Sequence, residues 1–265
     1  MKTVGLIGGM SWESTIPYYK IINEYVGKAL GGLHNARIIL YSVEFGELEK
    51  YMSAGEWDKI EKILTDAAMK LQNAGAEVIL ICTNTMHKMF PQIQGRLSVP
   101  MIHIADATAD ELERHGKKRV ALLGTRYTMT EDFYKSRLID RGFEVFIPDD
   151  EDIKIVNDVI FDELCCGIVK SSSRDAYSAI IAKLKDKGAE AVILGCTEIG
   201  MLSMRGSRGR KSECLQRSIR SQMTGSDIYK QDLSLHGMRP SSVWPQALLP
   251  TVKTWDMKHL TEKDL

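Results

Sequence analysis

The sequence of 265 residues lacks several features that define specialised classes of protein. No apolar run approaches 18 residues, so we expect no transmembrane helix, no signal peptide and no membrane partner. The formal net charge is zero, and the first 202 residues show no basic surface of the kind that binds nucleic acid. A hydrophobic content of 44% is enough for one or two globular domains with a real core.

The cysteines also exclude more than they indicate. There are five, and they form no paired framework, which favours a reducing compartment and hence a cytoplasmic location. No Cys or His spacing typical of a metal site accompanies Cys82 or Cys196, so we expect no metal. We interpret the adjacent Cys165 and Cys166 as packing residues.

What the sequence does contain is one stretch that occurs twice, at Ala74–His87 and again at Lys187–Gly200. In a gapless overlay the two apolar runs coincide, and Thr83 falls on Cys196. Each copy is typical of a buried parallel strand that opens into a polar loop at its carboxyl end. Ligands of open α/β sheets bind at such ends, so the repeat predicts two matched loops with a hydroxyl or thiol at each.

A second pair of segments indicates two related halves. Lys2–Met10 resembles Lys118–Arg126 at an offset of 116 residues, close to the offset of 113 between Thr83 and Cys196. Strand-like and helix-like segments alternate in both halves, which predicts an α/β fold with a parallel sheet in each. Expected strands are 3–7, 37–43, 78–81, 100–104, 119–124, 144–147 and 191–194, and expected helices are 14–30, 55–73, 107–115, 130–141, 153–165 and 175–187.

The pattern predicts three regions: an N-terminal half over residues 1–100, a C-terminal half over 101–202, and a tail over 203–265. The tail carries 11 Lys and Arg against 6 Asp and Glu, and its first part is rich in Arg, Ser and Gly. Hydrophobic periodicity is weak there, which favours disorder or loose packing over an ordinary domain.

Polar and glycine residues follow the expected strands where a small anion would bind. Two glycines, Gly8 and Gly9, let backbone amides approach an anion closely. Around them the expected substrate-binding residues are Met10, Ser11, Asn84, Thr85, Thr125 and Thr197, most of which carry a hydrogen-bonding side chain. His87 is either a structural histidine or a partner of Cys82.

Proton-carrying side chains at two matched strand ends suit one reaction in particular. A racemase removes a Cα proton from one face of its substrate and returns one to the other face, and two protein acids can do this without a cofactor. We expect Cys196 to be the base, with a thiol pKa lowered from about 8.5 by local dipoles. Cysteine as buried filler is the other interpretation.

Six motifs give this sequence a specific resemblance to the aspartate/glutamate racemase family, most of all to its L-aspartate/glutamate-specific branch. They are GLIGGMSWESTIPYY (5–19), GEWDKI (55–60), CTNTMHK (82–88), HIADAT (103–108), LLGTRYTM (122–129) and GCTEIG (195–200). The resemblance covers Met1 to about Leu202. It implies a cofactor-independent racemase with an amino-acid substrate, two pseudosymmetric α/β domains with the active site between them, and a homodimer.

The sequence departs from the family pattern in two places. Where the family has Cys-Asn-Thr, this chain has Thr83-Asn84-Thr85, preceded by Cys82. Neighbouring residues on a strand point to opposite faces, so only one of Cys82 and Thr83 can face the substrate; we favour Thr83. After Leu202 the sequence no longer resembles the family. A shifted reading frame or a rearranged carboxyl end would produce such a change.

Three functions therefore remain open at this point. The first is racemisation of aspartate or glutamate, with Arg126 as a candidate for binding the side-chain carboxylate. The second is decarboxylation of a malonate-type acid, which resembles this chemistry but needs only one cysteine. The third is binding of a small anion without catalysis, or an inactive paralogue with a disrupted carboxyl end.

Overall fold

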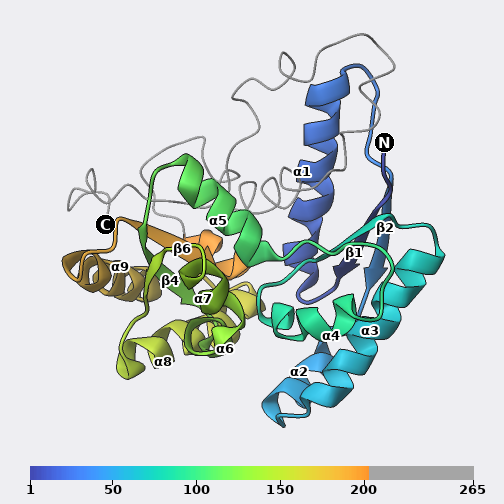
Figure 1. The fold of residues 1–265 in the computed structure, drawn as a ribbon. Helices are drawn as coiled ribbons and strands as arrows, with labels where there is room; N and C mark the ends of the chain where they lie inside the picture. Colours follow the sequence, from blue (N-terminus) through green and yellow to red (C-terminus); the bar gives the residue numbers. More distant parts are fainter. Residues whose placement is uncertain (203–265) are drawn as a thin grey trace. The chain divides into compact units, whose positions relative to one another are not determined.

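The computed structural model describes residues 1–202, which form two α/β units of the same design (Figure 1). The predicted tail over 203–265 lies outside the described residues. Unit 1 comprises Met1–Ala107, and unit 2 continues from Thr108. The elements of unit 1 are β1 (Val4–Gly8), α1 (Trp12–Leu30), β2 (Ile38–Ser42), α2 (Phe45–Ser53), α3 (Trp57–Asn73), β3 (Val78–Ile81), the 3₁₀ turn η1 (Thr85–Met89) and α4 (Phe90–Gln94).

The helix α5 (Ile104–Arg114) runs from the end of unit 1 into unit 2. The remaining elements of unit 2 are β4 (Arg119–Gly124), α6 (Arg126–Thr130), α7 (Asp132–Ile139), β5 (Glu144–Phe146), α8 (Asp150–Asp158), the π-helical turn η2 (Val159–Glu163), the 3₁₀ turn η3 (Leu164–Cys166), α9 (Ser171–Asp186), β6 (Ala191–Gly195) and the 3₁₀ turn η4 (Thr197–Leu202). Among the described residues no helix is both long and apolar enough to cross a membrane.

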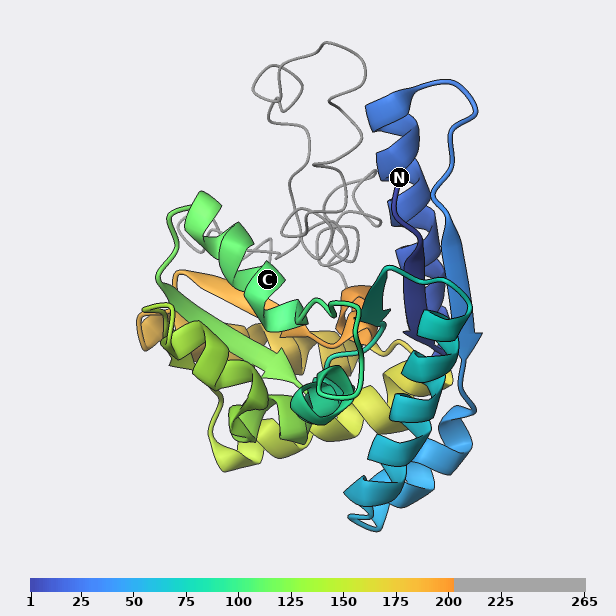
Figure 2. The same cartoon turned by 45° about the vertical axis from the view of Figure 1, so that its right-hand side comes forward.

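Both sheets are parallel and have the same strand order. In unit 1 the order is β2-β1-β3 (blue and teal strands in Figure 2). Within this sheet Val4 lies opposite Val78. In unit 2 the order is β5-β4-β6, with Val120 opposite Ala191. The two register pairs are related by the offsets of 116 and 113 residues found in the sequence, so the internal repeat of the sequence is also a repeat of structure.

The central strand of unit 1 is covered on both faces. All five residues of β1 are buried, as expected for a parallel strand between two layers of helices. Different helices cover the two faces: a Cβ atom on Gly5 would meet Leu71 of α3, and one on Gly8 would meet Thr15 of α1. The apolar face of α3 is buried, with Ile60, Leu64, Ala67, Ala68 and Leu71 inside and Ile63 partly exposed.

Unit 2 has an equivalent core. On one face of its sheet, Ala121, Leu123 and Val192 pack in a single cluster with apolar residues of α8 and α9. Tyr177 of α9 belongs to this cluster, and its hydroxyl donates to the carbonyl of Val156 at 2.9 Å. Each fully buried aliphatic side chain of this kind contributes about 1.5–3 kcal/mol by leaving water.

Three expected elements differ in kind from the structure. The helix expected at 153–165 is α8 only as far as Asp158, and the chain continues as the turns η2 and η3. The expected strand 100–104 is reduced to a single bridge between Met101 and Ile79, because α5 already begins at Ile104. The expected helix 130–141 is divided into α6 and α7, because Glu131 is extended, with φ −82° and ψ 161°. The hydroxyl of Thr125 caps α6 five residues before the expected helix start, by accepting from the N–H of Thr128.

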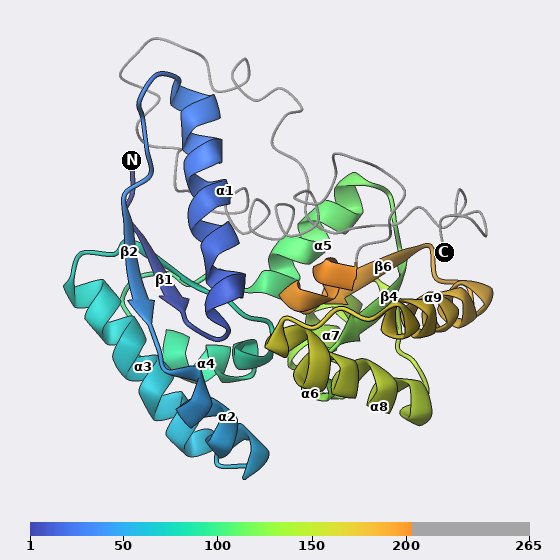
Figure 3. The same cartoon turned by 180° about the vertical axis from the view of Figure 1, so that it is seen from behind.

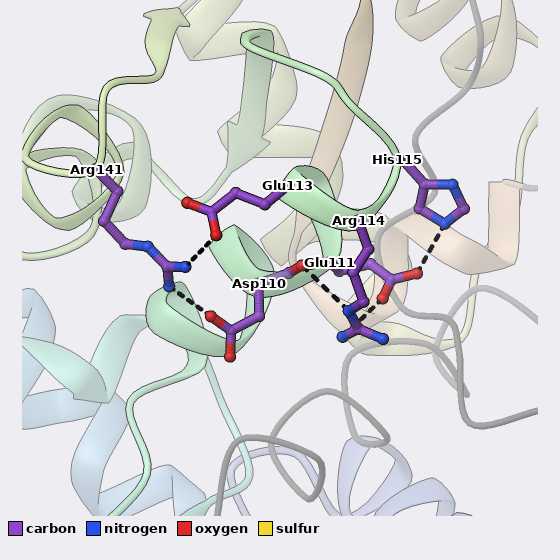
Figure 4. A network of polar contacts seen from close by, with 6 residues as sticks. All are labelled: Asp110, Glu111, Glu113, Arg114, His115 and Arg141. Carbon is purple, nitrogen blue, oxygen red and sulfur yellow. Dashed lines mark hydrogen bonds and ion pairs between the residues drawn. The ribbon is translucent and has the colours of Figure 1, made fainter. Parts of the chain in front are cut away.

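A charged cluster ties the end of α5 to the turn after α7 (Figure 4). Arg141 contacts Asp110 and Glu113, each at 2.7 Å. The fully buried carboxylate of Glu111 lies 3.0 Å from Arg114 and 2.9 Å from His115. Each carboxylate of the cluster contacts at least one arginine, so we interpret the cluster as structural.

Candidate functional site in two matched loops

The two predicted loops lie at equivalent places in the two units. We call residues 83–85 the first loop and residues 196–198 the second loop. The first loop follows β3 and includes the first residue of η1, and the second follows β6 and includes the first two residues of η4, as seen for the orange strand and turn in Figure 3. β1 lies parallel and next to β3, and β4 lies parallel and next to β6. The residues that directly follow β1 and β4 therefore lie at the same edge of the sheet as the loop of their own unit.

Cys82 belongs to the core of unit 1. Its side chain is 0% exposed, and its backbone N–H donates to the carbonyl of Ile7 at 2.9 Å, continuing the β1–β3 ladder. Burial raises the pKa of the Cys82 thiol far above its usual range. Thr83, by contrast, is half-buried. Cys82 is therefore a neutral packing residue, and Thr83 is the neighbour that solvent reaches.

The counterpart of Cys82 in unit 2 is Gly195, by the offset of 113 residues. A Cβ atom on Gly195 would lie 3.0 Å from the carbonyl oxygen of Leu123 and 3.1 Å from a methyl of Thr128. No side chain fits there unless its neighbours move. The interior position is thus filled by Cys82 in one unit and left small in the other, and Thr83 is the structural counterpart of Cys196.

A pair of buried histidines holds the first loop. The Nδ1 atom of His87 lies 2.7 Å from the carbonyl oxygen of Thr83, so Nδ1 carries the proton and donates it. The His87 ring meets the His103 ring edge-on, with centroids 4.7 Å apart. Nδ1 of His103 accepts from the N–H of Ala105 at 3.1 Å, at the start of α5. His87 is therefore a structural histidine that positions Thr83.

The other predicted residues of unit 1 lie in this loop and just before α1. Asn84 and Thr85 are buried, as are Met10 and Ser11 at the start of α1. The hydroxyl of Ser14 lies 2.8 Å from the carbonyl oxygen of Ser11 and 3.2 Å from that of Cys82, so it links the first turn of α1 to the end of β3.

Gly9 shapes the turn between β1 and α1. Its φ is +89°, and a Cβ atom there would lie 2.3 Å from the carbonyl oxygen of Val43. Its N–H donates to the hydroxyl of Thr15 at 2.9 Å, so this amide serves the turn itself. Only glycine tolerates both the positive φ and the lack of space for a Cβ atom.

The second loop contains a carboxylate in direct contact with the predicted thiol. The Sγ atom of Cys196 donates to Oε2 of Glu198 at 3.0 Å, and the hydroxyl of Thr197 donates to the same oxygen at 2.5 Å. Cys196 and Thr197 are half-buried, and Glu198 is 8% exposed. Thr125, which follows β4 at the same edge of the sheet, is buried. Arg126 beside it is exposed.

These contacts correct the expectation of a lowered thiol pKa. Burial raises the pKa of Cys196, and the negative charge and hydrogen bond of Glu198 raise it further. Cys165 and Tyr177 face the same thiol from η3 and α9. Burial also raises the pKa of Tyr177, so that phenol stays neutral. In this arrangement Cys196 is a thiol at neutral pH.

Glu198 was missed by reasoning from the sequence, although a signal was present. In the gapless overlay it falls on Thr85, so the repeat marks it as the one place in the two loops where a charge replaces a hydroxyl. No group of three or more His, Cys, Asp or Glu side chains within residues 1–202 is arranged to hold a metal ion.

The chain is therefore a duplicated parallel α/β protein with a polar loop at the equivalent strand end of each unit. The model of the Asp/Glu/hydantoin racemase family matches residues 7–210, and the chain belongs to this family. This confirms the resemblance drawn from the six motifs.

Three relatives illustrate the match. A candidate Asp/Glu racemase from Yersinia pestis is 47% identical, with a TM-score of 0.74 over 84% of this chain and 97% of the other. An aspartate racemase homologue from Pyrococcus horikoshii is 35% identical, with a TM-score of 0.69 over 84% and 98%. The broad specificity amino-acid racemase RacX of Bacillus subtilis is 31% identical over 55% of this chain, and the match spans 64% of its own length.

Proposed function

We propose that this protein is a cofactor-independent racemase that interconverts the L and D forms of aspartate or glutamate. The observation that carries this proposal is the equivalence of Thr83 and Cys196 in two sheets of identical order and register. Membership of the racemase family supports it. In this proposal Cys196 removes the Cα proton of the L-amino acid, and Thr83 returns a proton to the resulting carbanion.

The surrounding residues have supporting roles in the proposal. Met10, Ser11, Asn84, Thr85, Thr125 and Thr197 bind the α-carboxylate and orient the substrate, and Arg126 binds the side-chain carboxylate. The α-carboxylate takes up the negative charge that develops on proton removal, so neutral donors close to it stabilise the carbanion.

The resemblance to the family supports a homodimer, and the cysteines support a cytoplasmic location. Cys82, Cys165, Cys166 and Cys196 are all free thiols, which fits a reducing compartment. Size-exclusion chromatography with light scattering tests the dimer, and a monomer across the working concentration range would contradict it.

The test of the proposed function is exchange of the Cα hydrogen in deuterated water. L-aspartate and L-glutamate are incubated separately with the protein, and deuterium at Cα and the D enantiomer are measured by mass spectrometry and chiral chromatography. We expect both products from at least one amino acid, and neither from the variant Cys196→Ala. A protein that only binds the anion would give no exchange, and an active Cys196→Ala variant would refute the role of this thiol.

One observation keeps a second function in view. Cys196 is the only thiol in the two loops, because Cys82 lies in the core. A decarboxylase of malonate-type acids needs one proton donor, and a protonated Cys196 fits that role. Release of carbon dioxide from a substituted malonate, without exchange of amino-acid hydrogens, would favour this reaction.

A further inference from the structure

The contact between Cys196 and Glu198 is difficult to reconcile with a base that is ready before the substrate arrives. The thiol donates its proton to a carboxylate 3.0 Å away, so the negative charge holds that proton in place. A base at this position must lose the proton at some stage. Something must therefore offset the charge of Glu198.

The substrate itself carries the required charge. When the sulfur of a thiolate lies within about 3.5 Å of a Cα atom, the ammonium group on that Cα is within reach of an oxygen that is 3.0 Å from the same sulfur. An ammonium group donates three hydrogen bonds and pairs well with a carboxylate. At 8% exposure Glu198 is largely shielded from water, so such a pair would be screened little.

We propose that Glu198 binds the α-ammonium group of the amino-acid substrate and thereby couples substrate binding to the ionisation of Cys196. The inference rests on the proposed function and adds to it a ligand for the amino group. The first loop has no equivalent, since the matching residue there is the neutral Thr85.

The proton balance of the coupled reaction is as follows. As the ammonium pairs with Glu198, the Cys196 thiol releases its proton to water. The thiolate takes the Cα proton, and the electron pair of the C–H bond stays on the substrate as a carbanion. Thr83 gives its hydroxyl proton to the opposite face of Cα and recovers one from water. One proton enters the solvent and one leaves it.

Other groups around the thiol do not supply the same switch. Cys165 on η3 and Tyr177 on α9 face Cys196, and neither a thiol nor a phenol can supply a positive charge. Glu198 is the one carboxylate that hydrogen-bonds the thiol within the described residues. Its effect on Cys196 is therefore the one that a bound cation would cancel.

The experiment compares the pH dependence of two kinetic constants in the full chain. The profile of kcat/KM reports the ionisation of the free protein, and that of kcat reports the complex with substrate. For L-aspartate we expect the apparent pKa in kcat to lie below that in kcat/KM. In Glu198→Gln we expect the two apparent values to coincide and KM to rise about ten- to hundred-fold, as for loss of a charged hydrogen bond.

A substrate analogue without the amino group separates binding from a general loss of structure. Succinate has the two carboxylates of aspartate and no ammonium. We expect its inhibition constant to change less than twofold or so in Glu198→Gln, while KM for aspartate rises. The control Glu144→Gln removes an exposed carboxylate on β5 and should leave both constants unchanged. Should Glu198→Gln fail to fold, Glu198→Thr replaces it, because threonine already occupies the matching position of the first loop.

Several outcomes would overturn the inference. One is equal apparent pKa values for kcat and kcat/KM in the unchanged protein. Another is a variant that retains the original KM for aspartate, or that loses succinate and aspartate binding equally. Absence of exchange in the unchanged protein, or activity in Cys196→Ala, would instead refute the proposed function on which the inference depends.

Discussion

The first and second loops follow equivalent strands and differ in all three side chains. Thr83, Asn84 and Thr85 in unit 1 correspond to Cys196, Thr197 and Glu198 in unit 2. The first loop presents only neutral groups and is fixed by a histidine that donates to its backbone. The second presents a thiol and a carboxylate in contact. One scaffold therefore carries two different acid–base environments.

This difference indicates how a duplicated fold can serve an asymmetric task. A threonine hydroxyl is a far weaker acid than a thiol, so Thr83 is protonated at any working pH. It can give a proton to a carbanion but can rarely remove one from Cα. Cys196 can do both once it ionises. The predictions below test whether the chemistry follows this division.

The largest expected effect distinguishes Thr83 from Cys82. Removing a general acid costs about 10²- to 10⁴-fold in rate, so we expect Thr83→Ala to lose that much activity in both directions. Cys82→Ala should keep activity within about twofold and lower the free energy of unfolding by about 1–2 kcal/mol, because it removes a buried sulfur. Initial rates and urea unfolding measure the two effects.

The reverse result would change the assignment. Collapse of activity in Cys82→Ala, together with normal activity in Thr83→Ala, would give the first-loop role to Cys82 despite its burial.

The next effect concerns the ionisation of Cys196 without substrate. Its pKa is raised by burial and by Glu198, so the thiolate is scarce at neutral pH and grows as pH increases towards that pKa. We expect alkylation of Cys196 by iodoacetamide to accelerate about tenfold per pH unit between pH 7 and 9. In Glu198→Gln the pKa falls, and labelling at pH 7 should be faster.

Labelling is followed by mass spectrometry of the peptide that contains Cys196, with Cys196→Ser as the blank. A rate that stays constant over this pH range would indicate a thiolate that is already formed, and so would contradict the raised pKa.

A smaller effect is expected from making the first loop resemble the second. The equilibrium constant between enantiomers is one, so kcat/KM is equal in both directions and asymmetry can appear only in the saturated rates. We expect the unchanged protein to have a higher kcat from L than from D. Thr83→Cys should raise kcat from the D enantiomer by about tenfold, because a thiol is the better base.

Measured kcat values from both enantiomers decide this point. Equal values in the unchanged protein, or no gain in the variant, would show that the loops do not divide the two proton transfers as described.

The smallest effect lies away from both loops, in the charged cluster at the end of α5. Arg141→Met removes two contacts of 2.7 Å from a partly exposed site, and we expect a loss of about 1 kcal/mol in the free energy of unfolding with no change in exchange. Thermal unfolding at low and high salt measures it. A change in exchange rate would mean that the cluster reaches the chemistry after all.

Much of the fold could be predicted from hydrophobic pattern alone. The strands 78–81 and 119–124 have the predicted bounds, because continuous apolar runs between polar residues are typical of buried parallel strands. The strand at 100–104 was wrong, because the tertiary position of His103, which accepts from the N–H of Ala105, starts a helix there. The helix α2 was not predicted; its amphipathic pattern spans only nine residues.

The sequence was enough to choose the candidate acid–base residues, but not to predict the direction in which the pKa of Cys196 is shifted. The repeat in the sequence relates Thr83 to Cys196, and the burial of Cys82 supports that choice. The pKa direction of Cys196 was wrong, because it depends on where the Glu198 side chain points. A spacing of two residues does not fix that direction, whereas the 3₁₀ turn η4 does.

The lack of space at Gly195 limits the exchange of segments between the two units. A Cβ atom there would press on the carbonyl oxygen of Leu123 and on a methyl of Thr128, and shortening residue 128 relieves only the second contact. We therefore expect a graft of the Cys-Thr-Asn-Thr segment of unit 1 onto unit 2 to lower the stability of unit 2, and to lower it less when Thr128 is shortened to alanine or serine in the same step.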